Sequence, residues 1–253
     1  SEHKMAGHSH WAGIKHKKAL IDSKRGKLWS RLSKAIIIAA KIGGGDPDSN
    51  SRLRQAIADA KAVSMPKDNI SRAVKKGTGE IAGGDVEEIL YEGYGPNGVA
   101  VLCEVMTDNR NRTAPELRKL FEVHNGKLEK SNSVGYMFDR KGVFLIAKES
   151  NDEESLMEVA LEAGAEDIQP VGENFEIISP PEKFSAVADA LSNASIECVS
   201  RSINRIPNNT VDLDGDGTRK VLKFMDALDD HDDVQNVSAN FNITPEIMKE
   251  LDL

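Results

Sequence analysis

Basic side chains gather near the beginning of this chain, at a spacing suited to binding a string of phosphate groups. The set comprises Lys15, His16, Lys17, Lys18, Lys24, Arg25, Lys27, Arg31 and Lys34. Lysine and arginine neutralise phosphates and release the counterions around a nucleic acid, so such a set can supply much of the affinity for one. The alternative is that these side chains form only a solvated surface. Their placement on one side of a predicted helix favours phosphate binding.

Two histidines and a tryptophan precede most of this basic set. His8, His10 and Trp11 lie in a segment rich in glycine, histidine and lysine, residues 6–18, that predicts an extended arm. Flat aromatic rings stack on unpaired bases. A tryptophan can equally anchor such an arm on the apolar side of the helices. The sequence leaves both roles of Trp11 open.

A second polar cluster, residues 107–113 (Thr-Asp-Asn-Arg-Asn-Arg-Thr), lies between a predicted strand and a predicted helix. Arg110 and Arg112 have the chemistry to contact phosphates or base edges. Alternatively, the asparagines and the aspartate shape the turn, and Thr113 caps the helix. The residue types alone leave both interpretations open.

No arrangement of residues predicts an enzyme. The sequence has no glycine-rich phosphate loop, no His-Glu-x-x-His pair, no nucleophile elbow and no Cys-x-x-Cys pair. Asp212, Asp214 and Asp216 begin like a calcium loop, but Lys223 stands at the twelfth position, where calcium requires a bidentate glutamate. We therefore expect these aspartates to cap the next helix, and we expect neither a cofactor nor a metal ion.

The charge of the chain is divided between its two parts. Residues 1–79 carry 17 Lys and Arg against 6 Asp and Glu, a net of +11, whereas residues 80–253 carry 16 against 35, a net of −19. A basic module joined to an acidic body indicates that the first part binds a polyanion and that the second part repels it. The cluster at 107–113 is the one segment of the body that we expect to face a nucleic acid.

The composition predicts a cytoplasmic protein with no membrane partner. No apolar stretch approaches the roughly 20 residues that cross a bilayer, and the beginning of the chain lacks the pattern of a secretory signal. Cys103 and Cys198 lie far apart in apolar runs, which favours buried free thiols and a reducing compartment.

The basic set needs a helix to position it, and the pattern of residues 22–42 predicts one. Its apolar residues fall on one face, and Lys24, Lys27, Arg31 and Lys34 fall on an adjacent face. Further helices are predicted from Asn50, as the N-cap, to Val63 and from Pro66 to Lys76. These helices predict a basic three-helix domain with its arm over residues 5–79.

After a glycine-rich linker at 77–85, the pattern changes to alternating strands and helices. From Gly142 the order is strand, helix, two strands, helix and strand, which is typical of a ferredoxin-like domain. The segments around it are too small to fold separately. We therefore predict an α+β protein of three domains, in which a ferredoxin-like βαββαβ domain (135–206) is inserted in a discontinuous α/β domain (86–134 and 207–253).

The chain resembles the YebC/PmpR family of probable transcriptional regulators, which is related to the mitochondrial translational activator of cytochrome c oxidase. The resemblance rests on segments that follow one another along nearly the whole chain. They include Met5–Trp11, Ile14–Lys18, Met65–Ile70, Tyr91–Pro96, the cluster at 107–113 and Asp233–Val237. Glu129 to Asn132 departs from the glycine-containing pattern of the family, so we expect Asn132 to adopt a left-handed backbone and Glu129 to be strained.

The resemblance implies a helical domain followed by two α/β domains, one inserted in the other. It also implies two functions: a translation factor that touches ribosomal RNA and eases synthesis of proline-rich segments, or a transcriptional regulator that binds promoter DNA. The sequence predicts no helix-turn-helix with base-reading side chains, and an arm with Trp11 suits irregular RNA. The ribosome is therefore the expected partner and promoter DNA the alternative.

Overall fold

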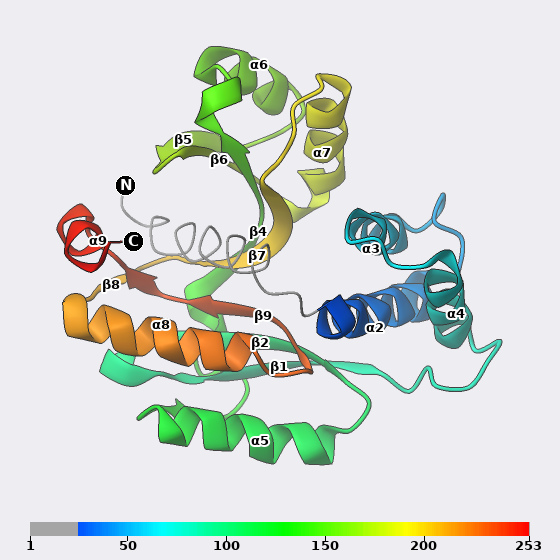
Figure 1. Cartoon of the computed structure of the whole chain (residues 1–253), viewed down its shortest axis with the longest axis horizontal. Coiled ribbons are helices and arrows are strands. Elements are labelled where there is room, and N and C mark those ends of the chain that lie inside the picture. The colour runs from blue at the N-terminus through cyan, green and yellow to red at the C-terminus, as the bar shows by residue number, and fades with distance from the viewer. Residues whose placement is uncertain (1–24, 253) are drawn as a thin grey trace.

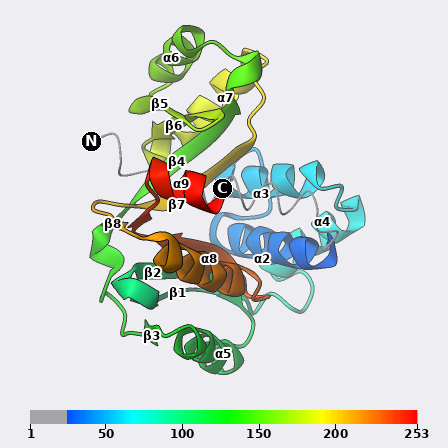
Figure 2. The same cartoon turned by 60° about the vertical axis from the view of Figure 1, so that its left-hand side comes forward.

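The computed structural model describes residues 25–252, and it contains the three predicted domains (Figures 1 and 2). In Figure 1 the helical domain lies on the right, the ferredoxin-like domain at the top and the first α/β domain below. The predicted α+β class is therefore confirmed, including the insertion of one domain in the other.

The helical domain consists of α2 (Arg25–Gly43), α3 (Ser51–Ala62) and α4 (Lys67–Thr78). Ile36, Leu53 and Ala60 are fully buried where α3 and α4 pack on α2. Asn50 caps α3 as predicted, because its side chain accepts a hydrogen bond from the Leu53 amide at 3.0 Å. The predicted end of the third helix was wrong: Gly77 lies inside α4, where a Cβ atom would collide with the Ile37 carbonyl of α2.

The first α/β domain is built on a four-stranded sheet of order β3-β1-β2-β9. Its strands are β1 (Glu87–Tyr94), β2 (Ala100–Thr107), β3 (Lys127–Leu128) and β9 (Val234–Ala239). The sequence pattern predicts strands over residues 98–106 and 234–243, where the structure has β2 and β9, but it predicts no strand at β1. In β1 the residues are exposed at its start and become buried only at its end, so no regular alternation marks it.

Two helices, α5 (Arg110–Val123) and α8 (Gly215–Asp229), pack on the same face of this sheet. The rings of Phe121 and Phe224 meet edge to face with their centroids 4.9 Å apart. Asp214 caps α8 by accepting from the Gly217 amide at 2.6 Å, so the predicted cap is confirmed. The opposite face of β2 buries Ala100 and Leu102 against Phe138.

The inserted domain has the strands β4 (Phe138–Ala147), β5 (Asp167–Val171), β6 (Asn174–Ser179) and β7 (Ser200–Pro207). Its helices are α6 (Glu153–Glu162) and α7 (Phe184–Asn193). The antiparallel order β5-β6-β4-β7 is that of a ferredoxin-like sheet. Phe144, Ile177 and Leu191 are fully buried between this sheet and the two helices.

The C-terminal segment differs from the prediction. The sequence pattern predicts one strand over residues 234–243, whereas the structure divides it into β9 and β10 (Phe241–Asn242), and β10 pairs with β8 (Val211–Asp212). A further helix, α9 (Pro245–Leu251), follows, and it was not predicted. Short 3-10 turns are η1 (Pro96–Gly98), η2 (Gly135–Met137), η3 (Lys148–Ser150) and η4 (Pro181–Lys183).

The junction near residue 130 confirms one expectation and corrects another. Asn132 has a φ of 67°, the predicted left-handed backbone. Its amide donates to the buried carboxylate of Glu92, which stabilises the turn. Glu129 does not have a positive φ, so the predicted strain there was wrong. Among the described residues, no helix is both long and apolar enough to cross a membrane.

Candidate nucleic-acid interface

The predicted binding residues divide between described and undescribed parts of the chain. His8, His10, Trp11, Lys15, His16, Lys17, Lys18 and Lys24 lie outside the described residues. Arg25 begins α2, and its side chain also lies outside the described part. The structure therefore places Lys27, Arg31 and Lys34 of the first helix and Arg110 and Arg112 of the second cluster.

The three cations of α2 contact an acidic loop, residues 229–233, which connects α8 to β9. Lys27 Nζ lies 3.7 Å from Asp230 Oδ1 and 3.4 Å from Asp232 Oδ1. Arg31 lies 3.6 Å from Asp229 and donates to the His231 carbonyl at 3.3 Å. The basic face predicted from the sequence thus exists, and in this structure it binds carboxylates of the same chain.

Asp233 joins this basic face to the second cluster. Its carboxylate is 1% exposed and accepts hydrogen bonds from Lys34 Nζ at 2.6 Å, Arg112 Nη2 at 2.8 Å and Thr113 Oγ1 at 2.7 Å. Burial alone would raise the pKa of Asp233, but the hydrogen bonds from Lys34, Arg112 and Thr113 outweigh it and lower the pKa to about 2. Three segments that lie far apart in the sequence therefore meet at one ionised carboxylate.

The cluster at 107–113 comprises the last residue of β2, a two-residue turn and the first turn of α5. Asn109, not Thr113, caps α5, since its side chain accepts from the Arg112 amide at 3.1 Å. The predicted cap at Thr113 was wrong because α5 begins at Arg110, with its cap four residues before Thr113, and Thr113 instead points at Asp233. Thr107 Oγ1 lies 2.8 Å from Thr113 Oγ1 and also accepts from the Asn109 amide.

The two arginines of this cluster have different surroundings. Arg112 bonds to Asp233 and lies 3.3 Å from Asp108. Arg110 is 59% exposed and lies 3.4 Å from Glu87, whose side chain is itself 49% exposed. An exposed pair of this kind contributes little and is easily exchanged for a phosphate. Arg110 is therefore the member of the cluster that remains accessible to a ligand.

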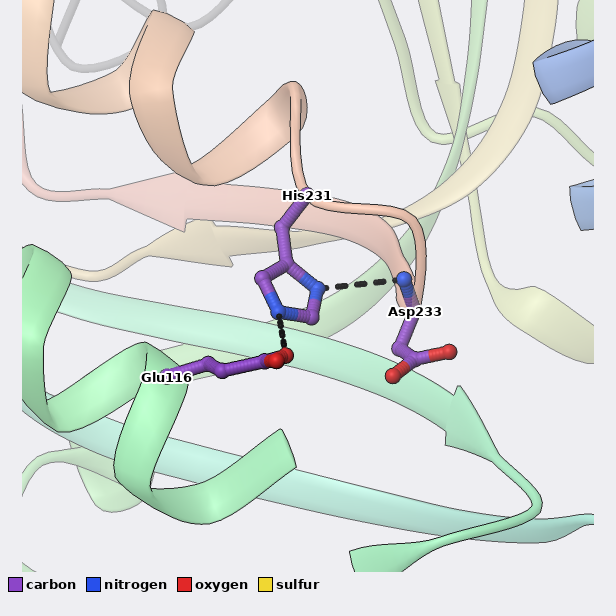
Figure 3. Close-up of side chains that lie close together, drawn as sticks. All are labelled: Glu116, His231 and Asp233. Atoms are coloured by element: carbon purple, nitrogen blue, oxygen red, sulfur yellow. Dashed lines mark hydrogen bonds and ion pairs between the residues drawn. The ribbon is translucent and has the colours of Figure 1, made fainter. Parts of the chain in front are cut away.

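His231 completes the contact between the acidic loop and α5 (Figure 3). Its Nε2 atom lies 2.9 Å from Glu116 Oε2, and its Nδ1 atom lies 3.1 Å from the Asp233 amide nitrogen, which donates to it. Glu116, His231 and Asp233 offer three atoms within 4.8 Å of one another, a spacing that a metal ion could bridge. However, a metal would have to displace Lys34 or Arg112 from Asp233, so the contacts favour a structural role.

A different set of cations is left accessible by these contacts. Residues 26–79 carry 11 Lys and Arg against 4 Asp and Glu. Within the described chain, no ion pair is formed by Lys61, Lys67, Arg72, Lys75 or Lys76. All five belong to the end of α3 and to α4. The sequence-based prediction of binding residues contains none of the five, although the helical pattern of residues 67–76 places Arg72 and Lys75 opposite Ile70 and Ala73 and was the available signal.

A cavity of about 990 Å³ opens where the three domains meet. Its charged lining is balanced, with four arginines (Arg52, Arg140, Arg201 and Arg205) and four acids (Asp59, Glu88, Glu104 and Glu182). Arg205 lies 3.3 Å from Glu104, and Arg52 pairs with Glu88 across the domain boundary. A lining that neutralises itself does not favour a polyanion, so the outer surface of the helical domain is the better candidate.

Known proteins resemble this chain along almost its whole length. Residues 9–80 match the domain family described as "TACO1/YebC protein N-terminal domain", and residues 86–241 match the one described as "TACO1/YebC second and third domain". A probable transcriptional regulatory protein of Natranaerobius thermophilus is 53% identical over 97% of this chain and 99% of its own. A protein described in the same words from Rhodopirellula baltica is 54% identical over 97% of this chain and 100% of its own.

A solved structure has the same fold. The crystal structure of a conserved hypothetical protein from Aquifex aeolicus has 47% sequence identity and a TM-score of 0.85, and the match covers 94% of this chain and 99% of that one. Together with the two domain matches, these similarities show that the chain belongs to the TACO1/YebC family.

Proposed function

We propose that this chain is a non-enzymatic, cytoplasmic regulator of gene expression that binds nucleic acid through its helical domain. The observation that carries the proposal is the accessible positive charge of that domain, which remains after the acidic loop has bound Lys27, Arg31 and Lys34. Transcription is the favoured process, because relatives about half identical over nearly the full chain are named probable transcriptional regulatory proteins. Promoter DNA is accordingly the favoured ligand.

A translation factor that binds ribosomal RNA and eases the synthesis of proline-rich segments is the second candidate. The residue types of the predicted arm support it, because His8, His10 and Trp11 can stack on unpaired bases. Arg110 supports either ligand, since its guanidinium is accessible and can pair with a phosphate.

The proposed absence of catalysis rests on how the titratable groups are used. Glu116, His231 and Asp233 are the described groups whose spacing most resembles a reactive site. Each is held by a partner in another segment, and Asp233 in addition is ionised and buried beneath Lys34 and Arg112. Such groups hold segments of the fold together, and we expect no turnover of nucleotides, peptides or esters by the full chain.

Crosslinking in cells, followed by sequencing of the nucleic acid bound to the full chain, tests the proposal. Enrichment of promoter DNA is the expected result, and enrichment of ribosomal RNA would instead establish the second candidate. In parallel, binding to duplex DNA and to purified ribosomes should be measured between 50 and 200 mM salt. Binding through phosphates must weaken steeply over this range. No binding to either partner at low salt would overturn the nucleic-acid proposal.

A further inference from the structure

The second and third helices of the helical domain form a helix-turn-helix that the sequence pattern had not predicted. The four residues 63–66 connect α3 to α4, and Ser64 has a φ of 59° that turns the chain sharply. Both helices pack against α2 and have few close contacts with each other. They therefore diverge after the turn, as in a helix-turn-helix, and do not form an antiparallel hairpin.

The outer face of α4 is polar, cationic and exposed. With 100° between successive residues, Lys67, Ser71, Lys75, Arg72 and Lys76 fall within an arc of about 180°. Ile70 and Ala73 lie on the other side and are buried against the rest of the domain. Lys67, Arg72 and Lys75 are exposed, and Lys61 at the end of α3 is exposed close to the turn. Asp68 is the one acidic residue of α4.

These cations differ from those of α2 in what they contact. Lys27, Arg31 and Lys34 lie within 4 Å of aspartates, so a phosphate would have to displace a carboxylate to reach them. No described residue forms an ion pair with Lys67, Arg72 or Lys75. These three can therefore bind phosphates without breaking any ion pair with the described part of the chain.

We propose that α4, together with Lys61, is the surface that docks on duplex DNA, with α4 as the helix that enters the major groove. This inference rests on the proposed function and names its binding surface. A helix with its side chains is about 10–12 Å across, and the major groove is about 12 Å wide, so α4 fits within it. In such an arrangement the first residues of the second helix meet the bases, and here these include Lys67, Asp68 and Ser71.

The test compares two variants of the full chain that carry the same change of charge. The first variant is K67E/R72E/K75E on α4. The matched control is R118E/K119E/K223E on α5 and α8, where the three residues are exposed and form no ion pair within the described chain. Binding to a 30-base-pair duplex should be measured by fluorescence anisotropy at several salt concentrations. Circular dichroism and thermal melting check that each variant is folded.

The α4 variant should bind duplex DNA about 30-fold or more weakly than the parent, and the slope of log affinity against log salt should fall by about 2 to 3. The control should change affinity far less. Equal losses in both variants, or a parental affinity in the α4 variant, would overturn the inference while leaving the proposed function intact. If the glutamates prevent folding, K67Q/R72Q/K75Q keeps good helix formers and should show the same salt slope.

The same assay separates the inference from the function on which it rests. A parent that binds neither DNA nor RNA would overturn the proposed function and this surface with it. A parent that binds structured RNA more tightly than duplex DNA, with the loss confined to the α4 variant, would keep the surface as a nucleic-acid site but overturn its assignment to DNA.

Discussion

The Nζ atom of Lys34 lies 2.6 Å from Oδ1 of Asp233, across a sequence separation of 199 residues. This contact joins α2 of the helical domain to the acidic loop before β9. Because Arg112 binds the other oxygen of the same carboxylate, the two cations share one buried anion. The position of the basic module on the acidic body therefore depends on Asp233 more than on any exposed pair in the acidic loop.

Replacing Asp233 with Asn should lower the free energy of unfolding by about 3 kcal/mol, because it leaves two cations facing a neutral group. The matched control is D232N, since Asp232 pairs with Lys27 at 3.4 Å but is 80% exposed. Such an exposed pair contributes less than about 1 kcal/mol. Urea unfolding followed by circular dichroism measures both. If D233N and D232N lowered the free energy of unfolding equally, the buried carboxylate of Asp233 would contribute no more to stability than an exposed one.

Asp233 also predicts how stability depends on pH. Its pKa is about 2 in the folded protein and near 4 in an unfolded chain, so the folded state holds the proton less tightly. The stabilisation is therefore complete above pH 4 and is lost as the pH falls from about 4 to 2. The difference in unfolding free energy between the parent and D233N should shrink over this window. A difference that stays constant to pH 2 would contradict the lowered pKa.

Glu176 should behave in the opposite way. This residue of β6 is fully buried, and burial raises its pKa to about 7, although Gln169 donates a hydrogen bond to it at 3.0 Å. A raised pKa in the folded state means that stability is lost as the pH rises from about 4.5 to 7. We expect Glu176→Gln to be more stable than the parent at pH 8 by about 3 kcal/mol and equal to it at pH 4. Thermal melts at both values test this, and a penalty at pH 8 would contradict it.

The two arginines in the first turn of α5 should have separable effects. Arg112→Ala should reduce stability, because it removes a hydrogen bond of 2.8 Å to Asp233. Arg110→Ala should leave stability within about 0.5 kcal/mol and weaken nucleic-acid binding. Melting temperature and binding affinity should be measured on both variants. If Arg110→Ala binds like the parent, the loop serves only as a turn and a helix cap.

Deleting residues 5–18 tests the arm that contains Trp11. Of the two roles that the sequence leaves open for Trp11, the hypothesis tested is that the arm binds nucleic acid and adds little to the stability of the helical domain. The shortened chain should therefore keep its melting temperature and bind structured RNA more weakly. A large drop in melting temperature would instead support the alternative in which Trp11 anchors the arm by packing.

Local patterns in the sequence were sufficient to predict most elements of the fold. The helices α3, α6 and α8 are capped by Asn50, Asp152 and Asp214. A short acceptor side chain satisfies a free amide at the start of a helix, and this local effect does not depend on the tertiary structure. The order of strands and helices from Gly142 to Ile203 likewise predicted a ferredoxin-like domain. The strand β1 and the helix α9 were missed, since neither has the regular burial pattern on which such predictions depend.

The sequence by itself determined which residues are basic, which face of α2 they occupy and that the two parts of the chain have opposite charge. Only the tertiary structure decided which cations are accessible. The periodicity of a helix gives the direction of a side chain but not what stands opposite it, and an ion pair requires its two charges to approach within about 4 Å. The acidic loop contacts Lys34 through Asp233 because β9, which follows the loop, pairs with β2 in the sheet. The two strands lie more than 100 residues apart in the sequence. That same packing left Lys67, Arg72 and Lys75 on the outer face of α4.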